Sequence, residues 1–177
     1  LPFYQLHHNR YAVYLDRFTD QEWQIAEQEY RAEEERQKDL VARTVDSVRI
    51  GEMQPERDHN LKSERNDVRD SDGRNFRSVL SGGWFEVDLK VDTTMPMELV
   101  VTYWGNERMR PNFIIAANGN QLAIEKLQGK PTNKFFDVVY RIPTEQSAES
   151  KTLTIRVEAL DGGTGPSIAG MRMVKSK

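Results

Sequence analysis

Residues 83–91 read Gly-Trp-Phe-Glu-Val-Asp-Leu-Lys-Val, and residues 97–105 read Met-Glu-Leu-Val-Val-Thr-Tyr-Trp-Gly. In each run every second residue is apolar, which is the period-two pattern of a half-buried strand. Pro96 lies between the runs and has no N–H to donate to a sheet, so we expect the strand to break there. The apolar faces carry Phe85, Val87, Leu89 and Val91 in the first run and Leu99, Val101 and Tyr103 in the second. These two strands predict half of a β-sandwich.

Further strands are expected on both sides of this pair. Asn118-Gly119 separates two apolar runs, and this dipeptide is the strongest short-range signal for a type I′ hairpin. The turn would place Ile115 opposite Leu122 and Phe113 opposite Ile124. The additional strands are expected at about residues 45–50, 113–117, 120–124, 136–142, 153–159 and 168–174. Seven or eight short strands at this spacing predict a mainly β fold, a jelly-roll β-sandwich.

A long helix is predicted before the sandwich. Thr19 and Glu22 have the spacing of a capping box, and neither Gly nor Pro interrupts the residues from about 20 to about 43. Acidic and basic residues recur four positions apart along it, each pair stabilising the helix by about 0.2–0.5 kcal/mol. The apolar residues gather at the two ends, with Trp23 and Tyr30 at the first. A charged centre of this kind is typical of a helix that bridges two bodies.

The composition excludes several classes of protein. A chain of 177 residues suffices for one well-buried domain and an appendage. The net charge of −3 argues against a general nucleic-acid binder, which would need a basic surface. No run approaches the roughly 18 apolar residues of a membrane helix, so we expect neither nucleic acid nor a membrane as a partner. The sequence has no cysteine, which excludes disulfides and thiolate metal sites.

Three segments are expected along the chain. It starts at Leu1 with neither an initiator Met nor a signal peptide, so we expect a piece of a longer protein. Residues 1–17 are predicted to be the terminal strand of a missing upstream sandwich, residues 18–43 the bridging helix, and residues 44–177 the jelly-roll. An unpaired apolar strand is a template for another chain. We therefore expect the isolated chain to dimerise through its N-terminal strand or helix, as a consequence of truncation.

Three groups of polar residues have both a chemical and a structural interpretation. His7-His8 could suggest a metal, but neighbouring residues of a strand point to opposite faces. Residues 70–73 start like a calcium loop without its later ligands, so a tight turn with Gly73 at positive φ is favoured. Residues 52–59 hold three carboxylates and a histidine that could serve acid–base catalysis, but hydrogen bonding within a polar, irregular segment 52–77 is favoured. We predict no catalytic residue, metal ligand or cofactor, and leave an irregular structural calcium site open.

Trp84, Tyr103 and Trp104 are the candidate ligand-binding residues. If the two opening strands formed one hairpin with Val91 opposite Met97, Trp84 would meet Trp104 on the outer face. Two exposed aromatic rings side by side could form a platform for a sugar ring. In the alternative interpretation both Trp side chains pack under a loop or against the helix.

Five segments carry a resemblance to a known family. They are 3–14 (Phe-Tyr-Gln-Leu-His-His-Asn-Arg-Tyr-Ala-Val-Tyr), 51–59 (Gly-Glu-Met-Gln-Pro-Glu-Arg-Asp-His), 83–85 (Gly-Trp-Phe), 99–105 (Leu-Val-Val-Thr-Tyr-Trp-Gly) and 134–138 (Lys-Phe-Phe-Asp-Val). Together they resemble the C-terminal region of the bacterial β-L-arabinofuranosidase family, glycoside hydrolase family 127 and its relatives. Members of that family carry a helical catalytic barrel, with a catalytic Glu and a Cys-coordinated zinc, followed by β-sandwich domains.

The resemblance implies a position for the chain but no catalytic residue, because the sequence has neither a barrel nor a cysteine. It implies a jelly-roll similar to galactose-binding-like domains, in which consecutive strands often belong to opposite sheets. On that ground we prefer opposite sheets to the single hairpin for the two opening strands. It also implies a periplasmic or extracellular location.

Three functions follow as hypotheses. The first is a non-catalytic accessory domain that braces or positions the catalytic domain of the same polypeptide through the helix. The second is a carbohydrate-binding module for plant-type glycans, with Trp84, Tyr103 and Trp104 as its site. The third, a hydrolase in its own right, is disfavoured because no pair of acids has a geometry that the sequence defines.

Overall fold

The computed structural model describes residues 19–105, 111–127, 133–160 and 162–177. Contacts divide the chain into two compact units, residues 1–39 and 40–177. The strand expected within residues 1–17, and His7-His8 with it, lie outside the described residues. The division into terminal strand, bridging helix and jelly-roll stays a prediction.

Helix α1 (Asp20–Arg43) has the predicted bounds. The capping box is confirmed, because the Thr19 N–H donates to Glu22 Oε2 at 2.7 Å and the Glu22 N–H donates to Thr19 Oγ1 at 3.3 Å. Ion pairs at the predicted i,i+4 spacing follow, such as Arg31–Glu27 at 2.6 Å. Within the described part of the chain, no helix has the length and apolarity needed to cross a bilayer.

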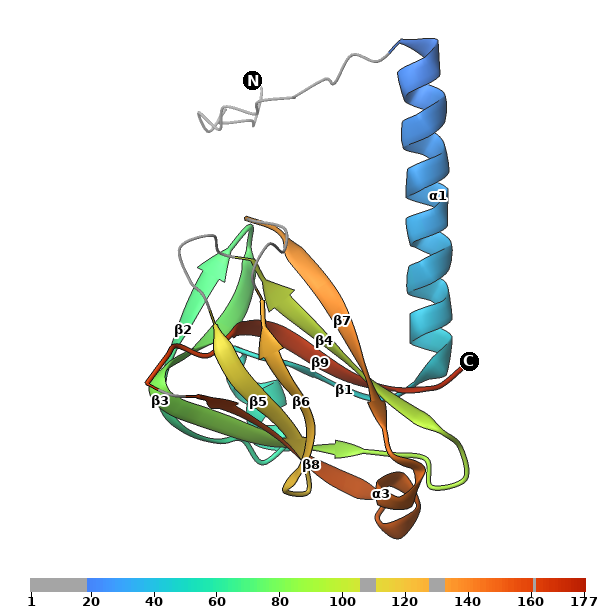
Figure 1. The fold of residues 1–177 in the computed structure, drawn as a ribbon. Coiled ribbons are helices and arrows are strands. Elements are labelled where there is room, and N and C mark those ends of the chain that lie inside the picture. Colours follow the sequence, from blue (N-terminus) through green and yellow to red (C-terminus); the bar gives the residue numbers. More distant parts are fainter. Residues whose placement is uncertain (1–18, 106–110, 128–132, 161) are drawn as a thin grey trace, which may run out of the picture. The chain divides into compact units, whose positions relative to one another are not determined.

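The described residues of the second unit form nine strands and two short helices (Figure 1). The strands are β1 (Thr44–Arg49), β2 (Lys62–Ser71), β3 (Arg74–Lys90), β4 (Met97–Trp104), β5 (Asn112–Ala117), β6 (Asn120–Lys126), β7 (Phe135–Ile142), β8 (Thr152–Ala159) and β9 (Ser167–Lys175). Helix α2 (Met53–Asp58) precedes β2, and α3 (Thr144–Glu149) follows β7.

The strands pair antiparallel in the order β6-β5-β8-β3-β9-β4-β7, with β1 added to β9 and β2 added to β3. Only two residue pairs, Arg77↔Ile168 and Ser78↔Ser167, join β3 to β9. The sheet therefore folds over at this junction into two layers, the β3–β8 half (β2, β3, β8, β5, β6) and the β4–β9 half (β1, β9, β4, β7). This confirms the predicted fold class, a mainly β antiparallel sandwich, here nearly closed into a barrel, with an N-terminal helix.

The core lies between the two halves, and the apolar faces predicted for the opening strands supply its centre. Phe85 and Leu89 of β3 and Leu99 and Tyr103 of β4 are all 0% exposed. β4 does not pair with β3; it lies between β7 and β9. The single hairpin is therefore wrong, and the preferred arrangement on opposite layers is confirmed.

The prediction that the segment 52–77 is irregular is wrong, because most of it is helix or strand. It contains α2, the ten-residue β2 and the beginning of β3. β2 is exposed on both faces over most of its length, and its only large apolar residue, Val68, is itself 49% exposed. The predicted tight turn is confirmed, since Asp72 and Gly73 have φ of 50° and 71° and connect β2 to β3.

The hairpin at Asn118-Gly119 is confirmed, with φ of 46° and 78° at its two central residues. The pairing predicted for it holds only beside the turn. A bulge shifts the register between Ile115 and Ala116, so that Ile115 lies opposite Ala123 and not Leu122, and Phe113 lies opposite Glu125. The extra residue in β6 moves the rest of the ladder by one position.

Candidate functional site

The outer face of the β3–β8 half carries two straight rows of side chains, one from each of five strands. Residues directly opposite one another across neighbouring strands point to the same face of a sheet. The first row consists of Glu64, Trp84, Glu158, Ile114 and Ile124, from β2, β3, β8, β5 and β6 in turn. The second row consists of Lys62, Glu86, Arg156, Ala116 and Gln121 from the same strands. We call these ten residues the outer face.

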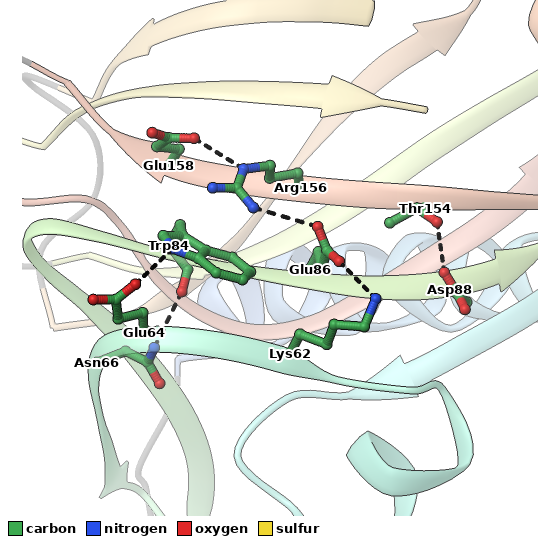
Figure 2. Close-up of polar contacts among 9 residues, drawn as sticks. All are labelled: Lys62, Glu64, Asn66, Trp84, Glu86, Asp88, Thr154, Arg156 and Glu158. Carbon is green, nitrogen blue, oxygen red and sulfur yellow. Dashed lines mark hydrogen bonds and ion pairs between the residues drawn. The ribbon is translucent and has the colours of Figure 1, made fainter. Parts of the chain in front are cut away.

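Trp84 and Arg156 form the centre of the outer face (Figure 2). The guanidinium carbon of Arg156 lies 3.9 Å from the centroid of the Trp84 ring, well within the range of a cation–π contact. The indole Nε1–H of Trp84 points to Glu64 Oε2 at 3.4 Å, and the Asn66 side chain donates to the Trp84 carbonyl at 3.2 Å. Glu64 and Asn66 both belong to β2, so this edge strand holds Trp84 in position.

Arg156 is held by carboxylates on two sides. Its Nε donates to Glu158 at 2.9 Å and its Nη1 donates to Glu86 at 3.3 Å, while Glu86 also accepts from Lys62 at 3.1 Å. A guanidinium has five N–H donors, and these two bonds are its only ones to described residues. The Arg156 side chain is 31% exposed, so it is partly accessible to solvent.

Acidic groups predominate around this centre. Of the nine residues that Figure 2 labels, Glu64, Glu86, Asp88 and Glu158 are acidic, whereas Lys62 and Arg156 are basic. Asp88 continues the polar face along β3 and accepts from Thr154 Oγ1 at 2.6 Å and from Asn60 Nδ2 at 3.0 Å. The arrangement combines an aromatic ring, guanidinium donors and carboxylate acceptors, which are the groups that bind the hydroxyls and C–H faces of a polar, ring-shaped ligand.

Gly83 lets β2 approach β3 next to this centre. A Cβ atom at Gly83 would lie 2.1 Å from the carbonyl oxygen of Arg65, closer than any side chain allows. Arg65 itself has φ of 52° and lies where the β2–β3 register shifts, between Glu64 and Asn66. The glycine and the bulge together place Glu64 and Asn66 against Trp84.

Trp104 lies in a different cluster, at the end of β4. Its ring stacks on Phe76 with centroids 5.8 Å apart and contacts Phe135 at 4.7 Å. The guanidinium carbon of Arg74 lies 4.8 Å from the Phe135 ring centroid. Phe76 is 5% exposed, so this group, which we call the end cluster, is largely packed on itself.

Tyr103 is buried in the core. Its hydroxyl lies 2.9 Å from that of Tyr140, and burial, reinforced by the neighbouring tyrosine, raises the pKa of Tyr103 well above its ordinary value. Burial likewise raises the pKa of Tyr140. The structure thus does not bring the three predicted site residues together: Trp84 lies on one layer, Trp104 on the other, and Tyr103 between them.

The acidic segment around Glu56 shows the hydrogen bonding favoured from the sequence. Glu56 is 5% exposed and accepts from Arg77 Nη2 at 2.6 Å, from Arg77 Nε at 2.9 Å and from the Gly51 N–H at 2.7 Å. His59 Nδ1 lies 2.7 Å from the Pro55 carbonyl oxygen, and Nε2 lies 3.3 Å from Asp46. Among the described residues, no group of three acidic or histidine side chains is arranged to hold a metal ion.

The sequence matches one family profile, the family of unknown function DUF6805, over residues 39–174. The chain belongs to this family. Comparison with curated proteins gave no match. The matched family has no assigned function.

Comparison with solved structures shows which proteins share the fold of this chain. A family 35 carbohydrate-binding module from Clostridium thermocellum aligns with a TM-score of 0.51 at 12% identity, over 66% of this chain and 93% of the module. The C-terminal family 6 module of a marine laminarinase from Zobellia galactanivorans aligns with 0.50 at 12%, over 73% and 98%. An exo-β-1,3-galactanase from Phanerochaete chrysosporium, solved with galactose, aligns with 0.53 at 8%, over 72% of this chain and only 28% of the enzyme. At these identities the likeness concerns the fold alone.

Proposed function

We propose that the sandwich is a non-catalytic carbohydrate-binding module whose site is the outer face. The observation that carries the proposal is the half-buried Trp84–Arg156 pair, a ring and a planar cation 3.9 Å apart, with carboxylates on both sides. The sandwich fold supports it, because modules with this fold, from family 35 and family 6, are named as carbohydrate-binding.

The chemistry of binding follows from the groups present. The C–H face of a sugar ring packs against the Trp84–Arg156 pair, in which the guanidinium already covers one face of the indole at 3.9 Å. The unused donors of Arg156 bind hydroxyl oxygens, and Glu158 and Glu64 accept from hydroxyl hydrogens. Because the ion pairs of Arg156 already fix its position, little conformational entropy is lost on binding.

The test is a calorimetric titration with galactan and arabinan oligosaccharides, followed by the variant Trp84→Ala. We expect this variant to lose at least about tenfold in affinity, which corresponds to about 1.4 kcal/mol. Trp23→Ala, in the exposed part of α1, is the matched control and should bind as the parent does. If Trp84→Ala retained full affinity while Trp104→Phe lost it, the end cluster would be the site and the assignment to the outer face would be wrong.

A second function is favoured by one observation, the apolar side chains on α1. Trp23, Ile25 and Tyr30 are 57%, 58% and 73% exposed. They support the hypothesis that the helix braces a catalytic domain of the same polypeptide, which the sequence resemblance suggests is an exported family 127-like glycoside hydrolase. Limited proteolysis of the full polypeptide tests this: a braced helix is protected over residues 20–39, whereas cleavage there as fast as in the isolated chain would exclude bracing.

A further inference from the structure

We infer that the ligand of the outer face is a neutral oligosaccharide, laid across the strands along the first row, and not a uronate or an amino sugar. The inference rests on the proposed function, since it names the class and the direction of the sugar at the same site. Three features support it: the length of the first row, the excess of carboxylates over bases on the outer face, and the change from charged to aliphatic side chains along the row.

The first row is longer than one sugar ring. Its five members lie directly opposite one another from β2 to β6. Neighbouring strands are about 4.8 Å apart, so the four steps from Glu64 to Ile124 span about 19 Å, and the three steps from Trp84 span about 14 Å. A chain of several sugars fits along this row, perpendicular to the strands, with one ring on Trp84.

The charges disfavour an acidic sugar. Both bases of the outer face are already paired, Lys62 with Glu86 at 3.1 Å and Arg156 with Glu158 and Glu86 at 2.9 and 3.3 Å. A uronate at Trp84 would add a negative charge beside carboxylates that outnumber the bases, with no unpaired cation of the outer face to receive it. Neutral hydroxyls, in contrast, use the same carboxylates as acceptors.

The far end of the row disfavours a charged sugar of either sign. Beyond Glu158 the row continues with Ile114, which is half-buried, and with Ile124. Ile124 is 54% exposed. Aliphatic side chains contact the C–H face of an uncharged ring, whereas a carboxylate or ammonium group would lose its water there.

The experiment is a glycan array carrying matched neutral, uronate and amino-sugar oligosaccharides, probed with the full chain at 50 and 500 mM NaCl. We expect the bound glycans to be neutral, with affinity that is at least about tenfold higher for trisaccharides than for monosaccharides and unchanged by salt. Uronate or amino-sugar binding would overturn the inference and leave the proposed function standing. Binding of no glycan would overturn the proposed function, and the inference with it.

The direction of the ligand is tested by Ile124→Ser. We expect this variant to lose about threefold or more in affinity for the trisaccharide and nothing for the monosaccharide, because only the longer ligand reaches β6. Val139→Ser is the matched control, since Val139 is also 54% exposed but lies on β7 of the other half. Equal losses for both sugars, or no loss for either, would contradict a ligand that runs across the strands.

Discussion

The buried pair Glu56–Arg77 offers a sharp test of whether the acidic segment near His59 is structural or catalytic. The two side chains are 7% and 11% exposed, and two of the guanidinium nitrogens contact the two oxygens of the carboxylate. The same carboxylate caps the Gly51 N–H. Glu56→Gln keeps the shape of the side chain and removes only its charge, so it leaves Arg77 buried opposite a neutral group.

Breaking a buried ion pair by removing one partner costs about 3–5 kcal/mol, and the amide oxygen of Gln can still accept one bond. We therefore expect Glu56→Gln to lower the free energy of unfolding by about 3 kcal/mol. With a urea slope of about 2 kcal/mol per molar, the unfolding midpoint should fall by about 1.5 M. Glu158→Gln, which breaks a pair whose carboxylate is 48% exposed, is the control and should cost at most about 1 kcal/mol.

A double-mutant cycle isolates the interaction between the two side chains. Arg77→Met alone leaves the Glu56 charge buried, but in the double variant neither charge remains, so its destabilisation should fall short of the sum by about 2 kcal/mol or more. Urea unfolding followed by tryptophan fluorescence measures all four proteins. Additive losses, or a Glu56→Gln variant as stable as the parent, would show that the carboxylate is not held for structure and would reopen a chemical role.

The remaining predictions concern backbone packing and the buried tyrosines. Gly83→Ala should unfold the chain or lower its melting temperature by many degrees, because the new methyl group would lie 2.1 Å from the Arg65 carbonyl oxygen. Gly170→Ala is the control and should be tolerated, because a Cβ atom there would have no neighbour closer than 3.4 Å. Similar melting temperatures for the two variants would refute the close approach of β2 to Gly83. Tyr103 and Tyr140 have raised pKa values, so their protonated forms stabilise the fold below about pH 10, the ordinary pKa, and this stabilisation is lost as the pH rises through the folded values. In an alkaline absorbance titration we expect two of the six tyrosines to ionise only on unfolding; ionisation of all six near pH 10 would contradict the burial.

Most of the strands could be predicted because one side of each is buried. The alternation of Phe85, Val87 and Leu89 with charged residues locates β3 and its inward face. β2 could not be found this way, because an edge strand exposed on both faces has no apolar period. Its one local signal was Asp72-Gly73, a dipeptide that favours a two-residue hairpin and that we interpreted only as a turn.

The site was predicted less well than the fold. Trp84 was singled out, but its partner Arg156 was not among the candidate residues, and Glu64 was missed because β2 was not predicted. Which side chains meet on a face depends on strand order, and β3 pairs with a strand that lies about 70 residues later in the chain. Alternation gives the face that a residue occupies, but it does not give its neighbours across the sheet.

β3 is 17 residues long and takes part in both layers, pairing with β9 near its beginning and with β8 near its end. A strand that belongs to both layers makes them one cooperative unit, because neither layer can lose it and stay intact. Amide hydrogens of β8 and β9 should therefore exchange only through global unfolding, while the edge strands β2, β6 and β7 open locally. A sugar bound at Trp84 would then slow exchange on the opposite layer, which it does not touch.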